Sequence, residues 1–342
     1  MADALLSPAV GTTMWAGSIA AIGYSARKLK ENIDNKTIPL MGVFGAFIFA
    51  AQMINFTIPG TGSSGHLGGG MILAVILGPY AAFLVMASVL TVQALFFADG
   101  GLLALGCNIW NLGIYPCFLA YPLIYKPIAG DGTSNRRIAI ALIISVLIAL
   151  QLGSFSVVME TLLSGKSELP FGTFVLFMQP IHLIIGLVEG FATVGIITYV
   201  QKARPEILQS SIEANPLNDR ISVKNVLVVF LILAGITGGA LSWFASTHPD
   251  GLEWSIEKVT GKGELAGQEQ GIAVVLKGIQ DKTVFFPDYN FKPGVKEESK
   301  EEKAPVWPGI EPGTSVAGIV GGGIVLGFLF IIGFGIRFFK RK

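Results

Sequence analysis

Long apolar segments alternate with short polar ones along most of this chain. A helix needs about 20 apolar residues to cross a bilayer. The pattern predicts nine such spans, at residues 11–25, 38–58, 67–78, 80–97, 107–125, 138–162, 174–199, 225–245 and 315–336. The third is short because Gly78-Pro79 interrupts the apolar run, and as a helix it would reach only about 18 Å. This is the pattern of an all-α polytopic membrane protein.

Hydrophilic segments divide the nine predicted spans into two groups. About seven spans fall within residues 1–200 and predict one helical bundle, which a hydrophilic linker at 201–224 follows. The remaining residues, 225–342, contain two spans, one before and one after a long polar region at 246–313. The chain is therefore expected to contain two membrane domains joined by a linker.

The polar region at 246–313 differs in character from the other connections. It opens with turn-forming Pro, Asp and Gly residues. Its apolar clusters, Ile272–Leu276 and Val284–Phe286, are expected to supply a small core, and the charged stretch from Lys292 to Lys303 an extended linker. His248 is expected to be an exposed loop residue.

Composition excludes several classes of protein. Charged residues make up only 14% of the chain and hydrophobic residues 52%, whereas a soluble domain carries about 25% charged residues. A net charge of +1 without a long basic tract speaks against a nucleic-acid partner. No phosphate-binding loop, nucleophile elbow or paired-cysteine metal motif is present, so any ATPase must be another subunit. Cys107 and Cys117 point in different directions on one helix, so neither a disulfide nor a metal pair is expected.

The distribution of Lys and Arg predicts how the chain is oriented. The loops at 27–36, 126–137 and 201–224, together with the C-terminus, carry fifteen basic residues, while the short loops on the other side carry only Lys166. Basic loops stay in the cytoplasm. The N-terminus is therefore expected outside and the C-terminus in the cytoplasm. The first residues, MADALLSPAVG, lack the basic region and cleavage site of a removable signal peptide.

A glycine-rich segment between the second and third spans, GTGSSGHLGGG at 60–70, is the leading candidate site. Six of its eleven residues are Gly, so its backbone can approach a ligand closely. It also holds His66, one of three histidines in the chain. Imidazole suits nickel, cobalt, copper and zinc, whereas calcium and magnesium need several oxygen ligands. From these residues alone, a small bound species and a plain surface connector are equally open.

Other polar residues near the predicted external ends of the spans are candidates to support such a site. Asp99 in FFADGGLLALG, with Asn108 and Asn111, can line the same cavity as His66, and Ser64 lies within the glycine-rich segment itself. The alternative is ordinary, since Asp-Gly marks a turn and Asn often caps a helix.

Two ionisable residues lie inside the predicted span at 174–199. His182 and Glu189, in QPIHLIIGLVEG, are seven residues apart and fall on nearly the same helix face. Ionisable groups at membrane depth are costly unless paired or hydrated. A functional role and a packing role are equally open, and neither residue is expected to bind metal directly. Gln93 and Gln151, alone in their spans, are expected to form interhelical hydrogen bonds.

Three separated motifs resemble one family. GTGSSGHLGGG, QALFFADGGLLALGCNIWNLG and QPIHLIIGLVEG are together similar to the M-type substrate-specific membrane subunit of nickel/cobalt energy-coupling-factor (ECF) ABC transporters. HPDGLEW and PDY, before one final span, resemble the family's small partner subunit of the PDGLE type, here fused to the M-type part. The resemblance covers nearly the whole chain.

The resemblance implies a non-enzymatic importer component of the prokaryotic plasma membrane. Such a component captures Ni²⁺ or Co²⁺ outside, has no resident cofactor, and works with a transmembrane coupling subunit and two cytoplasmic ATPase subunits. It also implies the ligands: the N-terminal amine, the backbone nitrogen and imidazole of the second residue, and the imidazole of the glycine-rich loop. The amine corresponds to Met1 and the loop imidazole to His66.

The N-terminus departs from the family's pattern. The family begins Met-His, whereas this chain begins Met1-Ala2-Asp3 and has no histidine before His66. Either the native chain starts a few residues earlier or this version lacks the chelating arm. The first explanation is favoured because LLSPAVG is similar to the family's N-terminal region with a few residues missing.

Two other functions remain open from the sequence. One is a substrate-specific subunit for an organic micronutrient, although the external loops offer mostly Gly and one His rather than aromatic and polar contacts. The other is an intramembrane enzyme that uses His182 and Glu189 as an acid–base pair. A growth defect relieved by excess nickel or cobalt would favour uptake.

Overall fold

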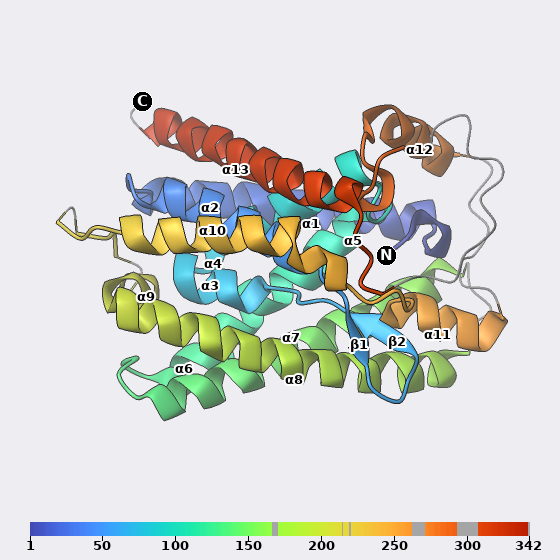
Figure 1. Ribbon diagram of the computed structural model, residues 1–342, viewed down its shortest axis with the longest axis horizontal. Helices are drawn as coiled ribbons and strands as arrows, with labels where there is room; N and C mark the ends of the chain where they lie inside the picture. The colour runs from blue at the N-terminus through green and yellow to red at the C-terminus, as the bar shows by residue number, and fades with distance from the viewer. Residues whose placement is uncertain (166–169, 214, 219, 262–270, 293–306, 341–342) are drawn as a thin grey trace.

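Long helices lie side by side along one axis of the molecule in the computed structural model (Figure 1). The structure describes residues 1–165, 170–213, 215–218, 220–261, 271–292 and 307–340. Four helices in this described part are at least 18 residues long and apolar enough to cross a membrane, namely Pro79–Phe97, Asn135–Ser164, Phe171–Ala203 and Pro312–Lys340. The prediction of an all-α polytopic membrane protein is confirmed.

Every predicted span contains a helix. The spans correspond to α1 (Pro8–Asn32), α2 (Thr37–Gln52), α3 (Gly70–Leu77), α4 (Pro79–Val92) with the π-helix η2 (Gln93–Phe97), α5 (Leu105–Ile109) with the π-helix η3 (Trp110–Tyr125), α7 (Asn135–Ser164), α8 (Phe171–Ala203), α10 (Lys224–Gly239) with the 3₁₀ helix η4 (Leu241–Phe244), and α13 (Pro312–Lys340). The connecting elements are η1 (Asp3–Leu5), α6 (Lys126–Ala129), α9 (Pro205–Glu213), α11 (Gly251–Thr260), α12 (Ile272–Thr283) and η5 (Pro287–Tyr289), with strands β1 (Phe56–Ile58) and β2 (Ser63–Gly65).

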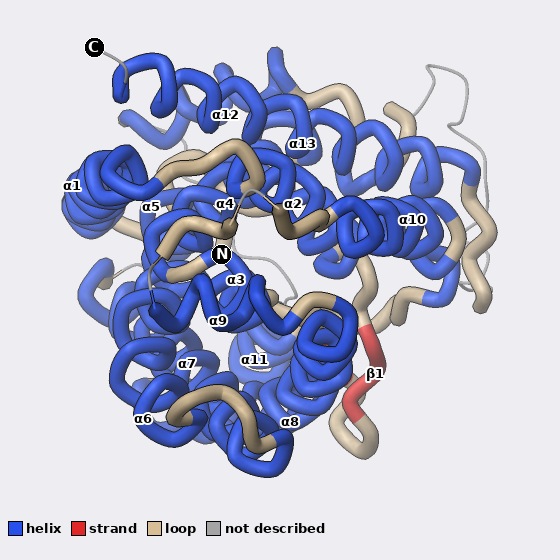
Figure 2. Tube along the Cα trace, turned by 90° about the vertical axis from the view of Figure 1, so that its left-hand side faces the viewer, coloured by secondary structure: helices blue, strands red, loops and turns tan. Residues whose placement is uncertain are grey.

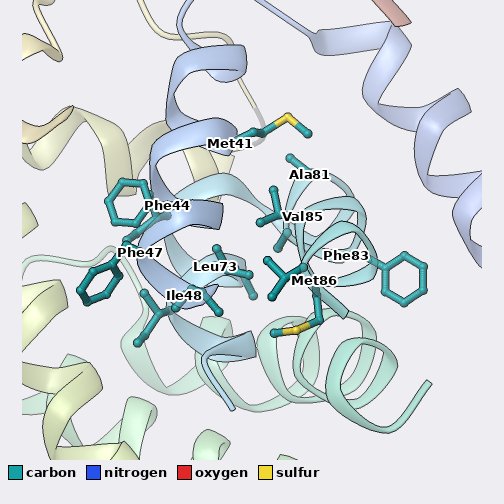
Figure 3. Close-up of a cluster of buried hydrophobic side chains, with 14 of the residues drawn as sticks. Met41, Phe44, Phe47, Ile48, Leu73, Ala81, Phe83, Val85 and Met86 are labelled. Carbon is teal, nitrogen blue, oxygen red and sulfur yellow. The ribbon is translucent and has the colours of Figure 1, made fainter. Parts of the chain in front are cut away.

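Helices α2, α3 and α4 form the centre of the bundle, and longer helices surround them (Figure 2). Their sequences are apolar on every side, as expected for helices that other helices enclose. Figure 3 shows side chains of these three helices gathered in one buried cluster, which includes Phe44, Leu73 and Val85. Because the centre is closed by packing, polar groups that enter it must find partners within the protein.

The two C-terminal spans pack on this centre rather than standing apart. The rings of Phe230 in α10 and Phe44 in α2 lie with centroids 4.4 Å apart. At the far end of α13, Lys340 donates hydrogen bonds to the carbonyls of Glu31 and Ile33, at 3.2 and 3.3 Å. The basic C-terminal end of α13 therefore lies beside the basic loop that joins α1 to α2.

The predicted span at 67–78 is only partly helical. Helix α3 begins at Gly70 and covers eight residues, a length of about 12 Å. Gly78, with a φ of +76°, separates it from α4. The backbone from His66 to Gly69 is not helical, and Gly68 and Gly69 are buried. The third predicted span is thus a buried non-helical stretch followed by a short helix.

The linker predicted at 201–224 contains a helix of its own. Helix α9 packs against α3 and α8 and buries Ile207 and Leu208. The hydroxyl of Ser211 lies 2.9 Å from that of Tyr121 in η3. This segment is therefore fixed to the bundle.

The prediction of a separate small core within 246–313 is wrong. Ala273 of α12 packs in a cluster with Leu6 and Leu103 of the bundle. The Phe285 ring lies 5.2 Å from that of Phe96. The clusters are too short to bury much apolar area by themselves, so they cover the outer end of the bundle instead. Most of the predicted linker from Lys292 to Lys303 lies outside the described residues.

Candidate metal-binding site

The glycine-rich segment begins as a short hairpin and then enters the bundle. Strands β1 and β2 pair antiparallel, with Phe56 opposite Gly65, and the turn between them uses positive φ angles of +78° at Gly60 and Gly62. After β2 the chain turns inward through His66 to the start of α3. Figure 1 shows the hairpin, α11 and α12 toward the end of the molecule where the N-terminus lies.

The buried carboxylate of Glu189 holds the inward part of this segment. Glu189, in α8, is 2% exposed and accepts hydrogen bonds from the backbone N–H groups of Gly68, at 2.7 Å, and Gly69, at 2.9 Å. The Gly68 carbonyl accepts a hydrogen bond from Gln52 at 2.8 Å. Gln93 donates in turn to Gln52 at 2.9 Å, which confirms that Gln93 bonds between helices. This network satisfies non-helical backbone that could not otherwise lie inside a membrane.

His66 lies where two cavities meet. Its Nδ1 is 3.0 Å from the carbonyl of Leu67, so Nδ1 carries a proton, and in the neutral ring Nε2 is the nitrogen with the lone pair. His66 lines an inner cavity of about 150 Å³ between α5, α7 and α8. It also lines an outer cavity of about 630 Å³ beneath the 246–313 region. Met1 lines both cavities as well.

The inner cavity brings together several of the predicted residues. Met1, His66, Asn108, Asn111 and His182 all line it. Asn108 lies inside α5 and Asn111 inside η3, so neither asparagine is a helix N-cap. Glu189 does not line this cavity, although its helix places it on the side of α8 that faces the glycine-rich segment. The sequence therefore predicted that His182 and Glu189 share a face of α8. In the structure, His182 lines the cavity, whereas Glu189 bonds to the loop backbone.

The N-terminal residues are docked against the turn that follows η2. The Met1 carbonyl accepts a hydrogen bond from the Gly101 N–H at 3.2 Å. The Asp3 carboxylate accepts one from the Ala104 N–H at 2.8 Å, just before α5 begins. These contacts hold Met1 at the boundary of both cavities.

Asp99 lines the outer cavity only and bonds to the polar region. Its carboxylate accepts a hydrogen bond from the Tyr289 hydroxyl. Burial, together with the negative charge of Asp99, raises the pKa of the Tyr289 hydroxyl well above its ordinary value. The hydroxyl therefore remains protonated at neutral pH and keeps donating to Asp99, which ties the turn after η2 to the segment after α12.

Ser64 joins the hairpin to the PDGLE motif. It lies buried in β2, and its hydroxyl donates to the carbonyl of His248 at 2.8 Å. Its backbone N–H donates to the carbonyl of Pro249 at 2.8 Å. The side chain of His248 is exposed, as predicted. Ser64 is not among the residues that line either cavity, so it positions the loop that carries His66.

One buried carboxylate beside the inner cavity was not predicted. Glu160 of α7 is 5% exposed and accepts a hydrogen bond from the side-chain amide of Asn111 at 3.0 Å. The criterion that singled out Glu189, an ionisable residue inside an apolar span, applies equally to Glu160 in the span at 138–162. Asp250 and Gly251 of the PDGLE motif also line this cavity, and only the fold could place them there.

A metal held here would rely on few side chains. Within the described residues, no group of three or more His, Cys, Asp or Glu side chains is placed to hold a metal ion. Cys107 and Cys117 are both buried and free. Among the residues that line the inner cavity, Met1, His66 and His182 carry nitrogen groups that can bind a metal. Nitrogen donors of this kind suit late first-row divalent metals.

Comparison with known proteins identifies the family. Residues 1–207 match the family model CbiM, described as the cobalt uptake substrate-specific transmembrane region, and residues 224–338 match the PDGLE domain. The chain belongs to the CbiM family. Its organisation is similar to that of a putative fused nickel transport protein NikMN from Archaeoglobus fulgidus, which is 31% identical over 96% of each chain.

Further relatives of this CbiM-family chain are also transporters. The fused nickel transport protein NikMN of Rhodobacter capsulatus is 28% identical, over 79% of this chain and 80% of that protein. A crystal structure of a transition metal transporter superposes with a TM-score of 0.53 at 29% identity, over 61% of this chain and 96% of the other. The family and its multi-pass architecture confirm the resemblance seen in the sequence. They place the chain among membrane transport proteins rather than enzymes.

Proposed function

We propose that this chain is the substrate-capture membrane component of an ATP-driven importer for nickel or cobalt. The observation that carries this is His66, which lines both the outer and the inner cavity together with Met1 and whose Nδ1 is taken up by the Leu67 carbonyl, so that Nε2 is the nitrogen left for a metal. The names of the CbiM-family relatives as nickel and cobalt transport proteins support the choice of metal. Energy would come from a separate transmembrane coupling subunit and two cytoplasmic ATPase subunits, because the chain contains no phosphate-binding loop.

We further propose that the N-terminus and the outer cavity face the cell exterior, and that the C-terminus faces the cytoplasm. The basic end of α13 contacts the basic loop between α1 and α2, and basic segments stay on the cytoplasmic side. The domain division follows the same lines: residues 1–200 capture the metal, 201–224 lie in the cytoplasm, and 225–342 form the PDGLE part.

The inner cavity is small for an organic micronutrient, and although the outer cavity of about 630 Å³ is not, the imidazole of His66 and the metals named for the relatives support a metal. Pockets for drug-sized ligands have volumes of roughly 300–1,000 Å³, whereas the inner cavity measures about 150 Å³. An enzymatic role for His182 and Glu189 has no support in the geometry. Glu189 bonds to two backbone N–H groups and does not line the cavity that His182 lines.

Replacing His66 with alanine should abolish high-affinity metal binding. The change removes an imidazole ligand and should weaken Ni²⁺ or Co²⁺ binding by at least about 10-fold. Isothermal titration calorimetry of the purified full chain measures this, and nickel accumulation in cells that also express the partner subunits tests transport. Gln209→Ala is the control, because that side chain is exposed on α9, lines neither cavity and should leave both results unchanged. Undiminished accumulation by His66→Ala would overturn the proposed function.

We propose that the region at 246–313 holds the metal-binding loops in place. Its PDGLE motif bonds to Ser64 beside His66, and Tyr289 bonds to the turn that docks Met1. The glycine-rich segment that carries His66, and the turn that holds Met1, therefore both contact this region.

Deleting residues 246–313 should reduce metal uptake while leaving the spans folded. The two ends are already close, because Trp243 donates a hydrogen bond to Ser315 at 2.7 Å, so a short Gly/Ser linker can join them. We expect weaker metal binding by calorimetry and faster cleavage of the 60–70 segment by protease. Uptake equal to that of the full chain would contradict this role.

A further inference from the structure

His182 and His66 share a feature that places both in the same site. Each lines the inner cavity, and each directs Nδ1 at a backbone carbonyl. In His182 the acceptor is Met178, one helical turn earlier in α8, at 2.8 Å. In His66 it is Leu67, at 3.0 Å. Carbonyls only accept hydrogen bonds, so Nδ1 donates in both rings, and in the neutral form of each ring Nε2 is the nitrogen that can bind a metal.

We propose that His182 supplies a second imidazole ligand, through Nε2, to the metal ion that His66 binds. The proposal rests on the proposed metal-capture function and deepens it. It replaces the expectation from the sequence that neither His182 nor Glu189 contacts the metal. It adds a second imidazole nitrogen to the one that His66 brings to this cavity.

The hydrogen bonds to carbonyls are the arrangement that metal-binding histidines use. Such histidines donate their second ring N–H to a carbonyl or carboxylate, which fixes the tautomer and orients the ring. His182 is only half-buried, so a ligand can reach its ring from the cavity that it lines. Within the described residues, Nε2 of His182 has no hydrogen-bond partner, and the residue lines a cavity that holds no other imidazole than His66.

The start of α11 limits how the His182 ring can lie. A Cβ at Gly251 would stand 3.3 Å from Cε1 of His182 and 2.9 Å from Ile181. The backbone of the PDGLE motif therefore packs directly on the imidazole edge, and the absent side chain leaves room for the ring. This contact, with the Met178 carbonyl, holds the ring from two sides.

Two nitrogen ligands across a small cavity also define the class of metal. Imidazole binds Ni²⁺, Co²⁺, Cu²⁺ and Zn²⁺, while Mg²⁺ and Ca²⁺ require sets of oxygen ligands. The cavity contains Asp250, but its Oδ1 already accepts hydrogen bonds from the N–H groups of Leu252 and Glu253, at 2.8 Å each. The site should therefore bind a late first-row divalent metal, Ni²⁺ and Co²⁺ among them, and discriminate against Mg²⁺.

The test compares His182→Gln and His182→Ala with His66→Ala in the purified full chain. Calorimetry with Ni²⁺ alone should show at least about 10-fold weaker binding for each variant. X-ray absorption of the nickel-loaded protein counts imidazole ligands directly, and we expect two in the unaltered chain and one in either single variant. Both side chains serve one ion, so their effects should not add. The double variant should bind Ni²⁺ only slightly more weakly than the single variant that has the lower affinity. Gln209→Ala, a change of an exposed side chain that lines neither cavity, should retain two imidazoles.

The outcomes separate this inference from the proposed function. If His66→Ala loses binding while both His182 variants keep full affinity and an unchanged imidazole count, His182 is not a ligand and the proposed function stands. If neither histidine affects nickel binding, the proposed function itself fails. A thermal unfolding scan of each variant in detergent tests folding. A His182 variant that melts as the unaltered chain does and still loses one imidazole supports direct coordination.

Discussion

Replacing Glu189 with glutamine is expected to release the glycine-rich segment from the bundle and abolish metal capture. The carboxylate accepts two backbone N–H groups, those of Gly68 and Gly69, at 2.7 and 2.9 Å. Glutamine keeps the shape but has one acceptor oxygen, so its amide N–H₂ would face one of these donors. A buried N–H left without an acceptor costs about 1–3 kcal/mol. His66 lies directly before this anchored stretch and should lose its fixed position.

Two measurements check this prediction. Thermal unfolding in detergent should show a lower midpoint for Glu189→Gln. Nickel calorimetry should show weaker binding, by more than partial unfolding of the variant would account for. Glu160→Gln is the matched control, because Glu160 is an equally buried carboxylate that bonds to Asn111 rather than to the loop backbone. Wild-type affinity and midpoint in Glu189→Gln would show that the loop does not depend on the carboxylate.

Replacing Gly318 with alanine is expected to force α13 away from α10. A Cβ at Gly318 would stand 2.3 Å from the carbonyl oxygen of Gly238 and 2.7 Å from its Cα. These neighbours are backbone atoms, so no side-chain rotation can relieve the clash. Small residues at such contacts allow membrane helices to approach closely, and overpacking typically costs about 1–3 kcal/mol.

The loosened helix pair should be visible as a lower unfolding midpoint and as faster proteolysis between the two C-terminal spans. Gly323→Ala is the control in the same helix, since a Cβ there would meet no atom within 4 Å. If Gly318→Ala melts at the same temperature as Gly323→Ala, the close approach of α10 and α13 does not contribute to stability.

The sequence was sufficient for the helical spans and for the glycine-rich segment, because both are local properties. Length and apolarity alone separate a membrane span from a loop, and the break at Gly78-Pro79 was visible as an interruption of the apolar run. The common face of His182 and Glu189 followed from helical periodicity. Glu160 was missed only because the same criterion was not applied to its span.

The polar region shows where local reasoning failed. Apolar clusters such as Ile272–Leu276 look the same whether they pack on one another or on another part of the chain. Only the position of α12 over the outer end of the bundle makes Ala273 a neighbour of Leu6 and Leu103. The choice depends on the apolar surface that the bundle leaves open, and a one-dimensional pattern contains no information about that surface.

By itself, the sequence determined the membrane class, the order of spans and the resemblance to one transporter family, and it named His66 as the leading candidate ligand. The tertiary structure alone decided which residues meet. It separated Glu189, which bonds to the loop backbone, from His182, which lines the cavity with His66 and Met1. The physical reason is distance along the chain: periodicity relates residues within one helix, whereas the meeting of α8 with a loop more than a hundred residues earlier depends on how the helices pack.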